Sequence, residues 1–270
     1  MTVRSALEVA TITDTGVVRS FNEDTIATEL DLGLALVADG MGGYKAGDVA
    51  SSMAASIMVT ELKRQLRDAP SSKNNIAEIL EFTVSRANRA IYQAAQANPQ
   101  HQGMGTTLVA SIFHDNHLHY AHVGDSRLYR LRRGKLHALT QDHSILHEQV
   151  VLGLISNDDA KISHNRNLVT RALGVESVCQ CEVQDQAVSV GDIYLMCSDG
   201  LNDMVDDANI ELALNALQAN LPLAAQQLVM MANDNGGHDN ISAVLIKVLE
   251  PFPASEQSRG LMGRLFGWLK

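Results

Sequence analysis

Four aspartates border apolar segments of the chain, at positions where buried strands would end or begin. Asp39 follows LGLALVA, Asp125 follows HLHYAHV after one glycine, Asp199 follows IYLMC after one serine, and Asp239 stands one residue before ISAVLIKV. A carboxylate at the end of a buried strand loses hydration, so it needs a cation, several hydrogen-bond donors or a metal ion as its partner. An aspartate before a glycine can also be a simple turn signal. Four of them that converged could not all ionise side by side without cations.

The donor atoms of these candidates are all oxygens, and no metal-type pair of histidines or set of cysteines accompanies them. Hard oxygen donors favour Mg²⁺ or Mn²⁺ over zinc or copper. Carboxylates from several distant segments favour a two-metal site, in which the ions lower the pKa of a bridging water and produce a hydroxide nucleophile near neutral pH. Arg19 stands three residues before Asn22, Glu23 and Asp24. A guanidinium beside an acidic cluster is suited to gripping a phosphate.

Hydrophobic periodicity predicts the elements that must position these residues. Short apolar segments bounded by Asp, Gly and Asn predict strands at residues 7–13, 25–29, 32–38, 106–113, 117–123, 127–132, 193–197 and 241–249. Helical spacing predicts helices at residues 49–66, 75–97, about 206–218 and about 222–233. Residues 140–175 are polar and are predicted to be irregular. Blocks of strands and blocks of helices indicate an α+β fold with antiparallel sheets.

The composition excludes several classes of protein. The 270 residues allow one large domain or two, and 46% hydrophobic residues can fill a sizeable core. With 21 Lys and Arg against 31 Asp and Glu, the net charge of −10 argues against a nucleic-acid partner. Three cysteines give no disulfide framework, and none is followed by arginine six residues later, which disfavours cysteine-based phosphate chemistry. With no signal peptide and no long apolar segment, a cytoplasmic protein is expected.

Six motifs occur in an order and at a spacing that resemble one enzyme family. They are RSFNED at 19–24, DGMGG at 39–43, GMGTT at 103–107, VGDSR at 123–127, SDG at 198–200 and DNIS at 239–242. Together they resemble the metal-dependent protein phosphatases of type 2C (PPM), and among these the bacterial branch with a minimal domain. The resemblance implies a β-sandwich of two packed antiparallel sheets, flanked by α-helices on both outer faces. It also implies a single catalytic domain at residues 1–250 and a short amphipathic tail at 251–270.

The resemblance implies metal-binding roles for the residues that match. Asp39 would bridge both catalytic ions, Mn²⁺ or Mg²⁺, and the Gly40 carbonyl would bind the second of them. Asp199 and Asp239 would hold the first ion. Asp125, together with Asp199, would recruit a weaker third ion.

The other matching residues would support the ions or the substrate. Glu23 would orient water on the second ion, and Asp24 would lie in the shell behind it. Asn240 would be a polar support beside Asp239. Arg19 would bind the substrate phosphate. Some family members carry a histidine where this chain has Met41, and methionine cannot donate a proton, so water on the third ion is the hypothesised acid.

The implied activity is that of a Mn/Mg-dependent serine/threonine protein phosphatase. A hydroxide that bridges the two ions would attack phosphorus directly, and the enzyme would oppose a bacterial Ser/Thr kinase. The alternatives are a phosphatase of small phosphoesters and a catalytically silent relative that binds phosphoproteins. The full set of Arg19, Asp39, Asp199 and Asp239 argues against the silent alternative.

Two further segments have a predicted role. The family carries a flap that touches protein substrates, and it would lie at about residues 140–175. His143 and His164 within it are candidates for docking or proton transfer, or else local hydrogen-bonding residues. The tail contains RGLMGRLFGWLK, which is locally basic and apolar on one side of a helix. The tail could pack on its own domain, contact a partner protein or contact a membrane surface, and the membrane is the least favoured of the three. A monomer is expected.

Overall fold

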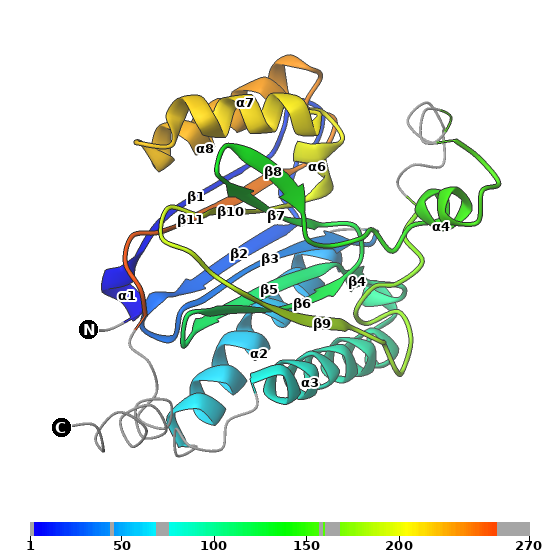
Figure 1. The fold of residues 1–270 in the computed structure, drawn as a ribbon. Helices are drawn as coiled ribbons and strands as arrows, with labels where there is room; N and C mark the ends of the chain where they lie inside the picture. Colours follow the sequence, from blue (N-terminus) through cyan, green and yellow to red (C-terminus); the bar gives the residue numbers. More distant parts are fainter. Residues whose placement is uncertain (1–2, 44–45, 69–75, 157–158, 160–167, 253–270) are drawn as a thin grey trace.

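Two antiparallel sheets lie face to face between two layers of helices (Figure 1). The structure is a computed structural model and describes residues 3–43, 46–68, 76–156, 159 and 168–252. The predicted tail, apart from its first two residues, the histidine at 164 and part of the predicted flap lie outside the described residues.

The first sheet has the strand order β1-β11-β10-β7-β8. These strands are β1 (Leu7–Asp14), β11 (Ile241–Val248), β10 (Ile193–Cys197), β7 (Arg127–Arg132) and β8 (Lys135–Ala138). All neighbouring pairs run antiparallel. Every residue of β10 is buried, and so is β11 except for Lys247, which explains why both segments are continuous apolar runs in the sequence.

The second sheet has the order β2-β3-β5-β6-β9, and the short β4 pairs with β3. Its strands are β2 (Asp24–Glu29), β3 (Leu34–Met41), β4 (Gly105–Thr106), β5 (Leu108–His114), β6 (His117–Val123) and β9 (Glu182–Ala187). Asp115 and Asn116 connect β5 to β6 with φ angles of 50° and 63°. Two consecutive residues in this left-handed region are typical of a type I′ hairpin turn.

The inner faces of the two sheets form the central core. Val37 and Val109 of the second sheet share this core with Met196 and Val244 of the first. Rings of Phe113 and Tyr194 pack edge to face across it, with centroids 5.4 Å apart. The alternate residues of the same strands point outward, so each sheet needs a second apolar layer on its other face.

Helices supply that second layer on both sides (Figure 1). α2 (Ala46–Asp68) and α3 (Ile76–Ala97) cover the second sheet, and α7 (Asp207–Leu217) and α8 (Leu221–Asp234) cover the first. Asp206 caps α7 by accepting from the Asn209 amide, and Asn220 caps α8 by accepting from the Leu223 amide. The predicted α+β sandwich with helices on both outer faces is confirmed.

Several sequence predictions need correction in detail. β8 and β9 were not predicted, because their residues are largely polar and half-exposed. The segment 140–175 is not wholly irregular: α4 (Ile145–Val151) begins there, with Ser144 accepting from the His147 amide as its cap. β3 begins at Leu34 rather than at residue 32, since residues 30–32 form a 3₁₀ turn that Gly33 ends at φ 67°.

The remaining described elements are short. They are α1 (Val3–Ala6), α6 (Asp199–Asn202) and a second 3₁₀ turn, Pro99–His101. Among the described residues, every helix is too short or too polar to cross a bilayer.

Candidate active site

One pocket of about 250 Å³ collects the residues that the sequence singles out. It lies where strand ends of both sheets meet. The pocket is lined by Arg19, Glu23, Asp39, Gly40, Met41, Gly42, Thr107, Asp125, Val169, Asp199, Asp239 and Asn240. Of the sequence-predicted site residues, only Asp24 is absent from the lining.

Asp24 lies directly behind this pocket. It opens β2 and pairs in register with Asp39 of β3, so the two carboxyl-bearing residues are cross-strand neighbours. Ser198 Oγ donates to Asp24 Oδ2 at 2.7 Å. Burial raises the pKa of Asp24 to about 6, against the lowering effect of its hydroxyl donors.

Asp39 is held at the end of β3 by two threonines. Its amide donates to Thr107 Oγ1 at 3.0 Å, and its carbonyl accepts from the Thr106 hydroxyl at 2.9 Å and from the Thr107 amide at 2.9 Å. These threonines belong to the GMGTT segment, whose function is therefore to fix the backbone of Asp39. These contacts join segments 67 and 68 residues apart, so no local pattern indicates them.

Asp199 and Asp239 come from the first sheet. Asp199 begins α6 immediately after β10, and Asp239 precedes β11, the strand paired with β10. Asp125 follows β6 of the second sheet. Together with Asp24 of β2 and Asp39 of β3, aspartates in or beside five strands therefore meet at one end of the sandwich.

Gly40 is required by the close approach of the chain to itself. A Cβ on Gly40 would lie 2.1 Å from the Gly47 carbonyl oxygen, so a side chain there would collide with backbone. The Gly40 amide donates to the Glu23 carbonyl at 3.2 Å. This packing brings Glu23 and Gly40 to the same wall of the pocket.

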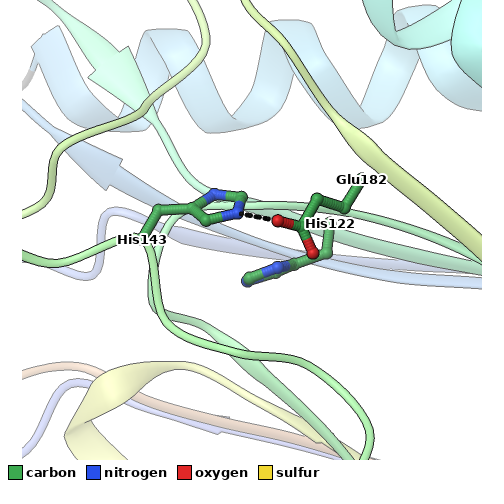
Figure 2. A group of neighbouring side chains, drawn as sticks. All are labelled: His122, His143 and Glu182. Atoms are coloured by element: carbon green, nitrogen blue, oxygen red, sulfur yellow. Dashed lines mark hydrogen bonds and ion pairs between the residues drawn. The ribbon is translucent and has the colours of Figure 1, made fainter. Parts of the chain in front are cut away.

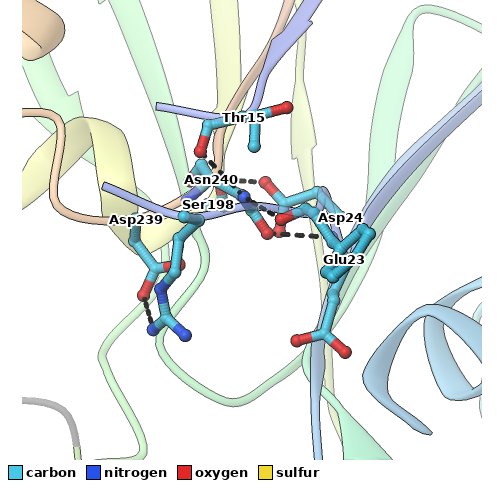
Figure 3. A network of polar contacts seen from close by, with 8 residues as sticks. Thr15, Glu23, Asp24, Ser198, Asp239 and Asn240 are labelled. Carbon is cyan, nitrogen blue, oxygen red and sulfur yellow. Dashed lines mark hydrogen bonds and ion pairs between the residues drawn. The ribbon is translucent and has the colours of Figure 1, made fainter. Parts of the chain in front are cut away.

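Asn240 is the centre of a polar network that positions the loop between β1 and β2 (Figure 3). Its Oδ1 accepts from the Glu23 amide at 2.8 Å, and its Nδ2 donates to the carbonyls of Thr15 and Phe21 at 3.0 and 2.9 Å. The same loop carries Arg19, whose Nη2 donates to Asp239 Oδ2 at 2.6 Å.

The carboxylates of the pocket raise one another's pKa values. Burial raises the pKa of Asp39 well above its usual value, and the charges of neighbouring aspartates raise it further. Burial likewise raises the pKa of Asp199, followed by the charge of Asp125. The pKa of Asp125 is raised to about 7, first by burial and then by the charge of Asp142. Such a cluster is unfavourable when ionised unless cations lie among the carboxylates.

The donor set of the pocket fits divalent cations. Glu23 Oε1, Asp24 Oδ1 and Asp199 Oδ1 are buried and have no hydrogen-bond partner among the described residues. Buried carboxyl oxygens are normally satisfied, so these atoms need a partner of another kind. All the donors are oxygens, which matches the preference of Mg²⁺ and Mn²⁺.

Asp203 was missed by the sequence reasoning. It stands one helical turn after Asp199, and its amide donates to the Asp199 carbonyl at 2.8 Å. Its charge raises the pKa of both Asp125 and Asp199, so it belongs to the same acidic cluster. The available signal was its spacing of four residues from Asp199, which places both on one helical face.

A larger hollow of about 490 Å³ lies elsewhere, beside the β7–β8 turn. Its acidic residue, Asp192, accepts two hydrogen bonds from Arg132 at 2.7 and 2.6 Å. This carboxylate is already neutralised, so the hollow lacks the features of the acidic pocket.

Comparison with known proteins gives a consistent result. The family model for protein phosphatase 2C matches residues 17–245. A serine/threonine phosphatase of Listeria innocua is 37% identical over 238 residues, which cover 87% of this chain and 93% of the relative. The protein phosphatase PhpP of Streptococcus pneumoniae is 32% identical, over 90% of this chain and 98% of its own length.

A solved structure adds the fold. The catalytic domain of the phosphatase PstP, crystallised in complex with two manganese ions, superposes with a TM-score of 0.79. It is 35% identical, and the match covers 90% of this chain and 99% of that one. The chain belongs to the protein phosphatase 2C family.

Proposed function

We propose that the chain is a Mn²⁺- or Mg²⁺-dependent protein phosphatase that hydrolyses phosphoserine and phosphothreonine. One observation carries the proposal: buried carboxylates from both sheets and a single arginine converge on one pocket, and several of the carboxyl oxygens have no partner among the described residues. The names of the relatives and the two manganese ions of the solved relative support it.

The arrangement supports a division of the pocket between two ions. Asp39, which lines the pocket, is the candidate to hold both of them. Asp199 and Asp239 come from the first sheet and would hold one ion. The Gly40 carbonyl and Glu23, which are neighbours in the lining, would serve the other. Asp24 and Asn240 hold this set from behind, through Ser198 and the Glu23 amide.

Arg19 is the candidate for binding the substrate. When bound, the divalent ions would supply Lewis acidity toward the phosphoryl oxygens and a water of lowered pKa as nucleophile. The Arg19 guanidinium can orient the phosphoryl group and neutralise charge on its oxygens in the transition state. The side chain of Arg19 is 51% exposed, so an incoming phosphate reaches it from solvent.

The leaving group needs a proton that Met41 cannot give. Met41 lines the pocket, and its thioether carries no acidic hydrogen. A seryl or threonyl oxygen is strongly basic, so its departure requires protonation. The side of the pocket formed by Asp125 and Asp199 is the candidate source of this proton, and these residues would hold a third, hydrated ion there.

Asp125→Ala should lower turnover of a phosphothreonine peptide by about 10²-fold or more. Turnover of p-nitrophenyl phosphate, whose leaving group needs no proton, should fall far less. Full peptide turnover by this variant at saturating Mn²⁺ would exclude the assignment.

The decisive test of the activity is release of phosphate from a phosphothreonine peptide. We expect release with Mn²⁺, none with EDTA, and none from Asp39→Asn. Asp31→Asn, which changes an exposed aspartate outside the pocket, is the matched control and should retain activity. Absence of Mn²⁺-dependent release from the unaltered chain would contradict the proposal.

Two alternatives are separated by the same assay. A phosphatase of small phosphoesters would prefer free phosphoserine or sugar phosphates to the peptide. A silent phosphoprotein-binding relative would bind the peptide and release nothing. The complete acidic set argues against the silent protein, since a decayed site is expected to lose its buried carboxylates, which are costly to keep without ions.

We further propose the wider setting of the enzyme. Residues 1–250 would form one catalytic domain, residues 140–175 its substrate-contacting flap, and 251–270 a tail that packs on the domain or contacts a partner. The chain would act as a cytoplasmic monomer on phosphoproteins and oppose a Ser/Thr kinase. Its three cysteines are all free, which suits a reducing compartment. Truncation after the proline at 253, followed by recovery from membrane fractions, tests whether the tail contacts membranes.

A further inference from the structure

A second polar cluster lies beside the turn that carries Asp125. His122 of β6, His143 and Glu182 of β9 have their side chains together (Figure 2). The rings of His122 and His143 are in contact, with centroids 4.6 Å apart and planes tilted by 34°. His143 Nε2 lies 3.1 Å from Glu182 Oε1. Both histidines are buried, with 1% and 5% of their surface exposed.

His143 is bonded twice to Gly124, the residue before Asp125. Its ring Nδ1 accepts from the Gly124 amide at 3.1 Å, and its own amide donates to the Gly124 carbonyl at 2.8 Å. An amide can only donate, so Nδ1 must be the unprotonated nitrogen. The ring proton therefore belongs on Nε2, where the Glu182 carboxylate accepts it. In this tautomer the nearby Arg171 guanidinium, which can only donate, pairs with Glu182 and not with the ring. Glu182 thus selects the tautomer of His143 that can hold Gly124.

The turn at Gly124 is closely packed, and each side of Asp125 is held by its own contact. Gly124 has φ 102°, and a Cβ there would lie 2.7 Å from the Thr107 side chain. On the other side of Asp125, Ser126 Oγ lies 2.7 Å from Thr107 Oγ1. The same Thr107 oxygen also accepts a hydrogen bond from the Asp39 amide. On the N-terminal side of Asp125, the hydrogen bond from the Gly124 amide to His143 Nδ1 holds the turn.

We propose that Glu182 and His143 form a positioning pair for Asp125: Glu182 fixes the His143 tautomer, His143 holds the Gly124 amide, and the Asp125 carboxylate is thereby kept aimed into the pocket to hold the weakest of its ions. This inference rests on the proposed function. It predicts that the pair acts on ion retention at Asp125 without touching substrate.

The same pair joins Asp125 to the predicted flap. The carbonyl of His143 accepts from the Thr170 amide at 2.7 Å, so both ends of the flap meet at this residue. Val169, next to Thr170, lines the catalytic pocket. Asp142, next to His143, holds Arg127 by two bonds at 2.8 and 2.7 Å. A change at His143 is therefore transmitted to Asp125 and to the flap edge together.

A metal ion held by the cluster itself is the competing interpretation. His122, His143 and Glu182 offer ligand atoms within 4.8 Å of one another, and both ring nitrogens of His122 lack a hydrogen-bond partner among the described residues. Two observations disfavour it. The Gly124 amide keeps the proton on His143 Nε2, the atom that a metal would need. The guanidinium of Arg171 lies 3.3 Å from that nitrogen and 3.7 Å from Glu182 Oε1, where a cation would have to enter.

Substitutions at His143 separate the two bonds of its ring. His143→Asn places an amide oxygen near the position of Nδ1, so it can still accept from Gly124 without needing Glu182. His143→Leu can do neither. We expect His143→Leu to weaken the lowest-affinity Mn²⁺ site about tenfold or more, and His143→Asn to restore most of the affinity.

Substitutions at Glu182 test the tautomer without disturbing the core, because 41% of this side chain is exposed. Glu182→Ala should weaken the same Mn²⁺ site about tenfold, whereas Glu182→Gln, whose amide oxygen can accept from Nε2, should lose less. Tyr120→Phe is the matched control: it removes bonds from β6 to Gln184 and to the Leu139 carbonyl but leaves Gly124 untouched.

Three readouts are needed on the full chain. Calorimetric titration gives Mn²⁺ stoichiometry and affinity, ¹⁵N NMR gives the His143 tautomer, and hydrogen exchange gives protection of the Gly124 amide in the metal-free protein. Exchange of this amide should quicken in Glu182→Ala and His143→Leu, and the control should match the unaltered chain. None of these readouts depends on turnover, so failure of the phosphatase assay is distinguishable from failure of this inference.

The inference is overturned if Glu182→Ala and His143→Leu both keep the Gly124 protection and the weak Mn²⁺ affinity. It is also overturned if Zn²⁺ binds stoichiometrically to the unaltered chain and His122→Phe abolishes that binding, which would establish the cluster as a metal site.

Discussion

The guanidinium of Arg19 lies against the carboxylate of Asp239, with Nη2 2.6 Å from Oδ2. One residue is the proposed phosphate ligand and the other a proposed metal ligand. The pair is only partly buried, with 51% and 28% of the side chains exposed. Ion pairs this exposed contribute little to stability, so Arg19 can leave Asp239 for a phosphate at small cost.

Removing the arginine should therefore separate substrate binding from metal binding. We expect Arg19→Met to raise KM for a phosphopeptide about tenfold or more and to weaken inhibition by inorganic phosphate, because the charge-assisted bonds to the phosphoryl group are lost. The Mn²⁺ concentration for half-maximal activity should stay the same or fall, since Asp239 loses a competing cation. Steady-state kinetics over a range of Mn²⁺ concentrations measures both. Arg86→Met, which changes an exposed arginine outside the pocket, is the control. A lower Mn²⁺ concentration for half-maximal activity in this variant too would show that the effect is not specific to Arg19.

The sandwich could be predicted from the sequence because its central strands are buried on both faces. β3, β10 and β11 are nearly continuous apolar runs. Among the helices that cover the sheets, α3 has strong apolar periodicity, and α7 and α8 have clear N-terminal caps. β8 and β9 lie at the sheet edges and carry polar, half-exposed residues, so neither pattern was present. These two strands are defined by pairing with a neighbour, which local sequence does not encode.

The candidate site was predictable for the same reason. Asp39, Asp199 and Asp239 stand where buried strands end or begin, and the six motifs supplied the rest. The supporting contacts were not predictable: the bonds from Thr106 and Thr107 to Asp39 and from His143 to Gly124 join segments that only tertiary packing brings together. Asp203 offered only its helical spacing from Asp199.

Neutralising the central carboxylate should abolish activity and stabilise the metal-free protein. Raised carboxyl pKa values mean that the native state holds protons more tightly than the unfolded state. This contribution to stability is present at low pH and is lost as pH rises through the folded values, about 6 for Asp24 and about 7 for Asp125. Asp39→Asn removes a fully buried carboxyl group whose own pKa is raised well above its usual value by burial and by the charges of Asp24 and Asp199.

The measurement is Tm by circular dichroism at pH 7.5, with EDTA and with Mn²⁺. We expect Asp39→Asn to melt higher than the unaltered chain in EDTA, to gain little from Mn²⁺, and to lose at least about 100-fold in turnover. The unaltered chain should gain clearly from Mn²⁺. Equal Tm values in EDTA would mean that the acidic cluster is not under electrostatic strain.

Loss of the Asn240 side chain should free the loop that carries Arg19 and Glu23. Three hydrogen bonds to this amide hold the loop, and the partly buried backbone groups that make them would lose their partner. We expect Asn240→Ala to cost about 2–4 kcal/mol of unfolding free energy and to raise KM. Urea unfolding and limited proteolysis between residues 15 and 23 check this. Asn220→Ala, which removes only the cap of α8, is the control and should lower stability without a change in KM.

Acid should destabilise the protein through His122. Burial, followed by the charge of His143, lowers the pKa of His122 to about 4, against 6.5 for an ordinary histidine. The unfolded state therefore binds a proton more readily between these values. The contribution of neutral His122 to stability is complete above about pH 6.5 and is lost as pH falls toward 4. At pH 5 the loss amounts to about 2 kcal/mol.

The raised carboxyl pKa values act in the opposite direction in the same range, so the test compares variants. His122→Phe keeps an aromatic ring beside His143 but cannot take up a proton. We expect the difference in unfolding free energy between the unaltered chain and His122→Phe to fall by about 2 kcal/mol from pH 7 to pH 5 in urea titrations followed by circular dichroism. Tyr120→Phe, on the same strand, does not titrate in this range and should show a constant difference. A constant difference for His122→Phe as well would mean that protonated His122 is accommodated in the native state, for example by turning a ring N–H toward Glu182.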